Sequence, residues 1–593
     1  MEKEKLRSEI AENFKWDANE LVSDFEASEK EVFELLDRVV DFQGKILGSS
    51  NNLLEFYKLE EELSRKADYL YMYAHLSSDV DTTDMTYKGL KMRTEKMMET
   101  ISNKTSFIVP ELLEANFSKI EEFIKENKEL EKYRFDLEKI YRYKEHTLSK
   151  SEEEIVTKAL NTFGTGDDAF TNLDNTDIYL GTINIDGKEI ELTHSNFIKY
   201  MNHADVNVRK QAFEKMYAYF KNHINTIAAC LKGTIKENFF ASDVKKYENP
   251  LQMSLFSDNI DISVYKNLIE VVHDNLDKLH DYMNIRKQML KLEEMHMYDI
   301  YLDLGESDTK EIPFVEGKKM VFEALKPLGE EYLKYLEKAF DEHRIDIYPS
   351  KGKKSGAYSW GSFNTKPYLL LNYNDTLDSV STMAHELGHS MHSFYSKSQG
   401  YTYAHYPIFL AEIASTVNEV LLNDYLYKNA KTDSEKLLYT ADMLDKIRTT
   451  IYRQTQFAEF EMLIHDKEEQ GIPLTAEEFT NTYYELNKKY YGDNVISDDL
   501  IRYEWARIPH FYSSFYVYKY ATGLTSALVI ASEILKGNEE MRKNYIKFLH
   551  SGGSDYPLNI LKNTGVDITD KNTIQKSFDY FEEQLGKIKK LIK

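Results

Sequence analysis

Hydrophobic residues recur at three- and four-residue spacings through most of the first 160 positions. Leu53, Tyr57, Leu63 and Leu70 are examples, and Glu and Lys fill the positions between them. This period predicts amphipathic helices. Residues 130–160 predict a helical hairpin, whose second helix begins after Ser149 with a capping sequence. Only ten prolines occur in 593 residues, so long helices meet few interruptions.

Two segments depart from the helical period. Residues 183–192 alternate with period two around Asp186-Gly187, which predicts a small β-hairpin. Residues 344–373 are short, β-rich and bounded by turns, which predicts a small sheet. Helices are expected from 196 to about 342, with a loop near 302–313, and again from 377 onward. The pattern predicts a mainly α fold with two domains, 1–195 and 196–593.

The amino-acid composition indicates which partners and which cellular compartment to expect. The formal net charge is −25, which disfavours binding to a phosphate backbone, so no nucleic-acid partner is expected. No apolar run approaches the ~20 residues of a membrane span, so no membrane association is expected. The single cysteine, Cys230, and the absence of an apolar leader at the start of the sequence favour a cytoplasmic protein.

The strongest chemical signal is the segment Thr382-Met-Ala-His-Glu-Leu-Gly-His-Ser-Met-His. On a helix, His385 and His389 share one face, with Cβ atoms about 5–6 Å apart, so both imidazoles can bind one Zn²⁺. Glu386 then points beside the metal, where it can take a proton from zinc-bound water. Gly388 in mid-helix indicates close packing of another backbone. The alternative is a chance match.

A catalytic zinc site needs a third protein ligand. Glu412 lies in the apolar segment Pro407-Ile-Phe-Leu-Ala-Glu-Ile-Ala-Ser-Thr-Val-Asn-Glu and is the candidate. The alternative is a salt-bridged helix acid. Glu419 is seven residues further on and faces the same way, so it is a candidate for orienting a histidine N–H group.

Two helix histidines that frame a glutamate in this way are typical of metalloproteases. Peptide hydrolysis needs hydrogen-bond donors for the oxyanion that develops on the attacked carbonyl. Residues 508–523 offer a histidine and several tyrosines as candidates: His510, Tyr512, Tyr516 and Tyr518. On a continuous helix, Tyr512, Tyr516 and Tyr520 would share one face, with Tyr518 turned away. Because the chain has 43 tyrosines, ordinary packing is the alternative for each of them.

The segment Ser355-Gly-Ala-Tyr-Ser-Trp-Gly precedes the histidine helix. Gly356, Ala357 and Tyr358 are predicted to present a sheet edge to which a substrate peptide adds as a strand. An ordinary hairpin is the alternative.

Several of these segments together carry a family resemblance. They are His385-Glu-Leu-Gly-His-Ser-Met-His, Phe409-Leu-Ala-Glu-Ile-Ala-Ser-Thr-Val-Asn-Glu, and Pro509-His-Phe-Tyr with the following Tyr-Val-Tyr-Lys-Tyr-Ala-Thr-Gly. Lys354-Ser-Gly-Ala-Tyr-Ser and Phe548-Leu-His-Ser-Gly-Gly-Ser-Asp-Tyr-Pro add to them. This combination resembles the oligoendopeptidase F branch of the thimet oligopeptidase-like zinc metallopeptidases, over essentially the whole chain.

The resemblance implies a two-lobed, helical, zincin-like metallopeptidase with a deep central channel and a small β-sheet next to the active-site helix. It implies one Zn²⁺ per chain on His385, His389 and Glu412, with Glu386 as the catalytic base. It also implies that His510 and one or more of Tyr512, Tyr516 and Tyr518 stabilise the transition state. The expected substrates are short, unstructured peptides cut internally, and the oligomeric state is left open.

Two alternatives remain at this point. One is an exopeptidase of the same family that releases dipeptides from a C-terminus, which needs a cationic group to hold the terminal carboxylate. The other is a non-catalytic, peptide-binding helical protein. A purely structural zinc site usually uses several thiolates, and this chain has one cysteine.

Overall fold

A computed structural model describes residues 5–18, 21–304 and 311–592. Residues 1–4, which belong to the start of the sequence where no leader was expected, lie outside the described residues, as does half of the loop expected at 302–313. The chain folds into two units. Unit 1 is the described part of 1–145, 309–422 and 533–565, and unit 2 is the described part of 146–308, 423–532 and 566–593.

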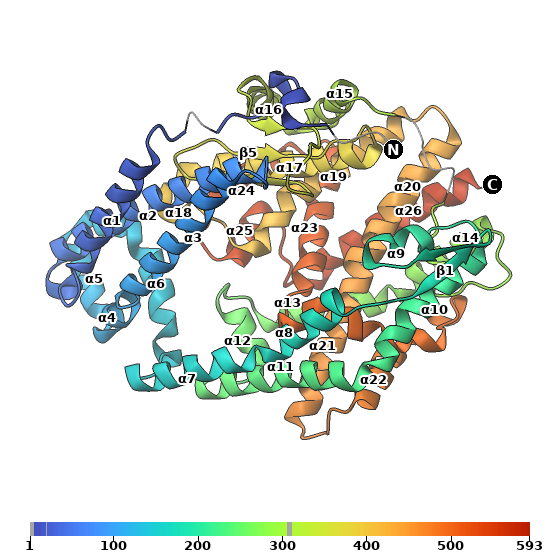
Figure 1. The fold of residues 1–593 in the computed structure, drawn as a ribbon, viewed down its shortest axis with the longest axis horizontal. Helices are drawn as coiled ribbons and strands as arrows, with labels where there is room; N and C mark the ends of the chain where they lie inside the picture. Colours follow the sequence, from blue (N-terminus) through green and yellow to red (C-terminus); the bar gives the residue numbers. More distant parts are fainter. Residues whose placement is uncertain (1–4, 19–20, 305–310, 593) are drawn as a thin grey trace. The chain divides into compact units, whose positions relative to one another are not determined.

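Unit 1 is built from helices around one small sheet, and α2 and α3 run side by side in it (Figure 1). Apolar side chains such as Leu36 on α1, Leu63 on α2 and Leu370 on β5 share one core. Its helices are α1 (Phe25–Val40), α2 (Ser50–Asp79), α3 (Met85–Thr105), α4 (Ile108–Glu114), α5 (Phe117–Glu126), α6 (Arg134–Arg142), α15 (Phe314–Ala324), α16 (Glu330–Asp341), α17 (Leu377–Ser396), α18 (Tyr401–Ala404), most of α19 (Ile408–Asn429), α24 (Glu539–Ser551) and α25 (Pro557–Thr564).

The sheet of unit 1 has the strand order β3-β5-β4, with β3 (Ile345–Asp346), β5 (Tyr368–Leu370) and β4 (Tyr358–Trp360). Ile345 lies opposite Leu369 in the parallel pair, and Tyr358 lies opposite Leu370 in the antiparallel pair. Helix α17 contacts both β4 and β5. The prediction of a small sheet in this segment, next to the histidine helix, is confirmed.

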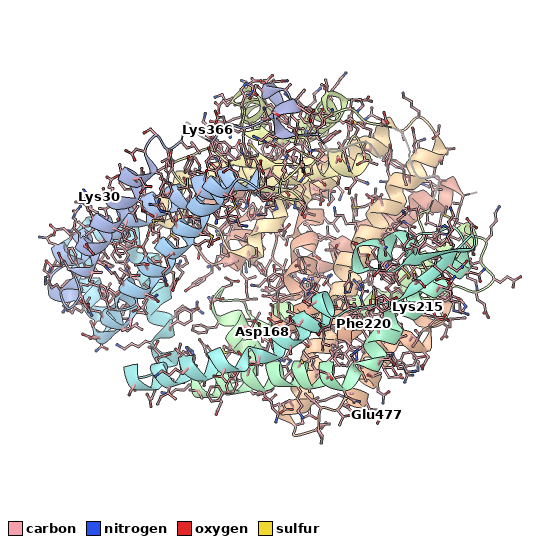
Figure 2. All side chains as sticks on the ribbon, in the orientation of Figure 1. Lys30, Asp168, Lys215, Phe220, Lys366 and Glu477 are labelled. Carbon is pink, nitrogen blue, oxygen red and sulfur yellow. The ribbon has the colours of Figure 1, made fainter. Side chains whose placement is uncertain are left out.

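Unit 2 is also mainly helical, and α20 packs against α26. Its helices are α7 (Lys150–Phe163), α8 (Thr165–Thr171), α9 (His194–Met201), α10 (Val206–Asn222), α11 (Ile224–Val244), α12 (Pro250–Phe256), α13 (Ile262–Asp274), α14 (Leu276–Met289), α20 (Asp433–Ile447), α21 (Arg453–Glu469), α22 (Ala476–Tyr491), most of α23 (Tyr518–Leu535) and α26 (Lys571–Leu591), with a long 3₁₀ segment η11 (Asp499–Arg507). Figure 2 shows Glu477 on α22 pointing outward, whereas Phe220 on α10 is buried.

Local sequence signals appear in unit 2 as expected. Strand β1 (Thr182–Ile185) pairs antiparallel with β2 (Lys188–Glu191). Asp186 and Gly187 between them both have positive φ, as a two-residue hairpin turn requires. Helix α7 begins with a capping box between Ser149 and Glu152. Both predictions are confirmed.

The mainly α fold is confirmed, whereas the sequence division at residue 195 and the deep channel stay predictions. Each unit joins three separated stretches of chain. In the described ranges, no helix has both the length and the apolar character needed to cross a membrane.

Candidate active site

Helix α17 carries the two histidines on one face. It begins after Thr376, whose side chain accepts the backbone N–H of Ser379 and thereby caps the first turn. The Nε2 atoms of His385 and His389 lie 3.1 Å apart. Their side chains are 26% and 17% exposed, so both rings are mostly buried but still reach solvent.

Glu412 on α19 completes a three-donor cluster. Its Oε2 lies 3.5 Å from Nε2 of His385 and 3.7 Å from Nε2 of His389. In a tetrahedral zinc site with bonds of about 2.0–2.1 Å, two donor atoms lie about 3.3–3.4 Å apart. The observed spacings of 3.1 to 3.7 Å therefore fit zinc, and two imidazoles with one carboxylate are a donor set of catalytic zinc sites.

The second nitrogen of each imidazole also has a partner. Nδ1 of His385 lies 3.3 Å from Oε1 of Glu419, and His389 hydrogen-bonds the backbone of Ala411. Burial opposes a charge on His385, but the hydrogen bond with Glu419 raises its pKa. Burial and the neighbouring His385 lower the pKa of His389 to about 4. These contacts fix both rings with Nε2 directed at Glu412, the arrangement that a metal ligand needs.

Glu386 lies next to the ligands but turns toward the sheet. It is 7% exposed, and its carboxylate accepts the backbone N–H of Ser359 on β4. Burial raises the pKa of Glu386 to about 7. A general base with a pKa near the working pH transfers protons most effectively.

Strand β4 forms an edge of the sheet, because within the described chain it pairs only with β5. Of the predicted substrate-binding residues, Gly356 and Ala357 precede β4, and Tyr358 opens it. The carbonyl of Gly356 accepts from the Asn372 amide, and the Tyr358 hydroxyl donates to Asp79 at 3.0 Å. The Tyr358 side chain thus anchors the strand to α2. Ser359, which touches Glu386, was not among the predicted residues.

The late segment of the chain is not the continuous helix that was expected. Residues Pro509–Tyr512 form a 3₁₀ turn, and α23 starts only at Tyr518. Phe515 between them has φ of +57°, in the left-handed region, which breaks the helix. The expectation that Tyr512, Tyr516 and Tyr520 share one helix face is therefore wrong.

Within this segment of unit 2, the structure groups three side chains. Nε2 of His510 lies 3.3 Å from the Tyr520 hydroxyl, and the ring of Tyr516 is 5.4 Å from the ring of Tyr520. The Tyr512 ring stacks on Phe170 at 4.4 Å and its hydroxyl is buried, and Tyr518 is 1% exposed. The predicted set of donors omits Tyr520, although its four-residue spacing from Tyr516 pointed to it.

Comparison with known proteins identifies the family. Residues 199–580 match the family model described as Peptidase family M3, and residues 111–179 match the model described as Oligopeptidase F. The chain belongs to Peptidase family M3. The chain is thus a metallopeptidase, and its three-donor cluster lies inside the region that the first model matches.

Similar proteins support this membership over the whole length. This chain is 39% identical to the Bacillus subtilis (strain 168) protein named Oligopeptidase PepF, and the match covers 99% of this chain and 88% of that protein. A solved structure from Chlamydophila abortus has a TM-score of 0.92 and 36% identity, covering 99% of this chain and all of that one. Oligoendopeptidase-F from Enterococcus faecium has a TM-score of 0.75 and 33% identity, covering 96% of this chain and 98% of that one.

In this M3 peptidase, the irregular segment before α23 is held by buried contacts of unit 2. The Glu461 carboxylate accepts the backbone N–H of Phe515 at 2.7 Å. The Phe515 ring is 1% exposed and packs on His465 at 4.5 Å. The Ser514 carbonyl accepts from the Ser254 hydroxyl at 3.2 Å. These contacts offset the cost of the left-handed residue and set the positions of His510 and Tyr516 on either side of it.

The two helices that carry the donors touch backbone to backbone. A Cβ at residue 388 would lie 2.5 Å from Cα of Ser415 and 2.7 Å from the carbonyl oxygen of Ala414. Asn418 adds a hydrogen bond from its side chain to the carbonyl of Ala384 at 2.9 Å. The prediction that Gly388 allows close packing of another backbone is confirmed.

We expect Gly388→Ala to destabilise the M3 peptidase and weaken metal binding. The added methyl group pushes α17 away from α19, and overpacking of this kind costs about 1–3 kcal/mol. The opposing gain in helix propensity is only about 1 kcal/mol. Denaturant unfolding and a zinc titration measure both effects. Gly89→Ala on α3 is the matched control, because a Cβ there meets nothing within 4 Å, and it should raise stability slightly. Equal stability of the two variants contradicts the packing argument.

Proposed function

We propose that this M3 peptidase is a zinc-dependent endopeptidase that hydrolyses internal bonds of short, unstructured peptides. The observation that supports it most is the convergence of His385, His389 and Glu412, with the carboxylate of Glu386 on the next position of the same helix. A zinc ion held there, one per chain, supplies Lewis acidity, polarising the substrate carbonyl and lowering the pKa of water toward about 7.

Residues of the chain itself transfer the proton and orient the groups that take part. Glu386 accepts the proton of the attacking water as the new C–O bond forms, and delivers it to the amine nitrogen as the C–N bond breaks. The Ser359 N–H orients the Glu386 carboxylate for both transfers. Glu419 holds His385 in the tautomer that leaves Nε2 free for the metal.

We further propose roles for two groups of residues outside the metal cluster. Strand β4, with Gly356, Ala357 and Tyr358 at its start, offers the free edge to which a peptide adds as a strand. His510, with Tyr516 and Tyr520, supplies hydrogen-bond donors for the oxyanion. We prefer Tyr516 and Tyr520 to Tyr512 and Tyr518, because the hydroxyl of Tyr512 is buried and Tyr518 is 1% exposed. The proposed location is cytoplasmic, because the lone cysteine Cys230 is a buried free thiol.

An internally quenched peptide blocked at both ends tests the proposal. We expect cleavage at an internal bond, loss of activity with 1,10-phenanthroline, and recovery when Zn²⁺ is added back. The non-chelating isomer 1,7-phenanthroline is the control for effects of the aromatic ring. Cleavage only of peptides with a free C-terminus favours the dipeptide-releasing exopeptidase instead. Binding without any cleavage favours a peptide-binding protein.

A further inference from the structure

Four arginines lie close together in the interior of unit 2, and we call them the arginine cluster. They are Arg286 on α14, Arg448 after α20, Arg453 at the start of α21 and Arg507 at the end of η11. Across the described residues, two carboxylates form ion pairs with them. Asp445 binds Arg286 at 2.6 Å and Arg448 at 2.8 Å, and Glu504 binds Arg453 at 2.6 Å. The cluster therefore holds four positive charges against two negative ones.

Arg507 is the member whose charge is least compensated. Its Nε is buried without a hydrogen-bond partner in the described parts of the chain. The guanidinium lies over the ring of Phe197 at 5.2 Å, and Glu504 is a neighbour. Glu504, however, already pairs with Arg453 and accepts the hydroxyl of Tyr483. Burial opposes the charge of Arg507, whereas Tyr217, Tyr301 and Glu504 nearby favour it and raise its pKa. The guanidinium therefore stays charged, and because it has no ion pair of its own among the described residues, it can take an anion as a partner.

Two of the four arginines are more accessible than the others. The side chains of Arg286 and Arg448 are 0% and 3% exposed, whereas that of Arg453 is 20% exposed and Arg507 is half-buried. Arg507 precedes His510 by three residues, across the junction of two 3₁₀ turns. Burial and then the charge of Arg453 lower the pKa of His510, so Arg453 also lies within electrostatic range of that ring. These two arginines are the more accessible members of the cluster, and the charge of Arg453 acts on His510, a residue proposed to contact substrate.

We propose that Arg507, together with Arg453, binds a carboxylate of the peptide substrate. The planar guanidinium donates two parallel N–H bonds, which match the two oxygens of a carboxylate. Either the C-terminus of the peptide or an acidic side chain can supply that group. The inference rests on the proposed function, because it takes a peptide as the ligand. It predicts that peptides with a free carboxylate bind more tightly than peptides without one.

Binding to the zinc-loaded Glu386→Gln chain tests the inference, because peptide is not consumed. Three fluorescent peptides share one core sequence and end in a free acid, in a carboxamide, or in a carboxamide preceded by Glu. We expect the free acid to bind about 10- to 100-fold more tightly than the plain carboxamide. Recovery of affinity by the third peptide assigns the site to acidic side chains instead of the C-terminus. Equal affinity for all three peptides overturns the inference.

Variants identify the residue responsible. In the Glu386→Gln chain that also carries Arg507→Gln, the dissociation constant of the plain carboxamide divided by that of the free acid should fall to near one. Arg507→Lys should keep part of this ratio. Arg502→Gln on the same η11 is the matched control and should leave the ratio unchanged, because Arg502 pairs with Asp499. A ratio that survives Arg507→Gln overturns the assignment.

A competition experiment covers the case in which Arg507→Gln does not fold. Acetate at constant ionic strength should weaken binding of the free-acid peptide and not of the carboxamide, with acetamide as the neutral control. No such competition overturns the inference. Separately, a chain that prefers carboxylates but cleaves no peptide keeps this inference and loses the proposed function. A chain that cleaves peptides but shows no preference for carboxylates loses this inference and keeps the proposed function.

Discussion

The Glu386→Gln variant should hydrolyse peptides about 100- to 10,000-fold more slowly than the wild-type chain, and it should still bind one zinc ion. Gln has nearly the shape of Glu, and its amide oxygen still accepts the Ser359 N–H. It cannot take a proton from water at neutral pH. Because the three side chains proposed to bind the metal are untouched, the loss should fall on kcat. Turnover of a quenched peptide and elemental analysis of the dialysed protein measure the two quantities together.

The pairing of these two measurements is what makes the Glu386 experiment informative. A variant that loses both activity and zinc indicates that residue 386 supports the metal and not the proton transfer. A variant with full activity removes Glu386 from the mechanism. Glu485→Gln, an exposed change on α22, is the matched control and should leave both quantities at the wild-type level.

The His389→Ala variant should lose the metal and, with it, all measurable hydrolysis. Two of the three donors remain, and a site with two protein ligands does not hold zinc firmly. The vacated volume also lies between α17 and α19, so stability should fall as well. A zinc titration followed by a competing chelator measures the affinity. An unchanged zinc stoichiometry contradicts the assignment of His389 as a ligand.

Glu419→Gln gives the graded comparison for His389→Ala. Glu419 touches His385 and not the metal position, so its loss should weaken zinc binding about 10- to 100-fold without abolishing it. The variant should regain activity at high zinc concentration, whereas His389→Ala should not. If both variants behave alike, Glu419 has a larger role than orienting the imidazole.

Local sequence patterns predicted much of the architecture because local physics determines it. The four-residue spacing of His385 and His389 fixes a shared helix face wherever the helix lies. The Asp186-Gly187 pair fixes a tight hairpin through its positive φ values. Gly388 revealed a helix contact because no side chain fits there. In the first two cases the responsible residues lie within a few positions of one another, and in the third a single glycine carries the signal for a contact with a distant helix.

The features that sequence reasoning missed depend on residues far apart in the chain. The break at Phe515 needs Glu461, more than fifty residues earlier, to hold its N–H. Ser359 reaches Glu386 only because the sheet packs on α17. Each unit is assembled from three separate stretches, which no helical period can indicate. The charge imbalance at Arg507 is likewise invisible until its neighbours are known.

The hydrogen bond from Ser359 to Glu386 ties the base to the strand proposed to receive substrate. A peptide that adds to β4 should stiffen that strand, and the same stiffening should steady the Glu386 carboxylate, which we propose transfers the proton. The order of the Glu386 carboxylate should therefore depend on how far the bound peptide extends along β4. Peptides too short to run along the strand should consequently turn over slowly even at saturating concentration, which makes length a control on rate as well as on affinity.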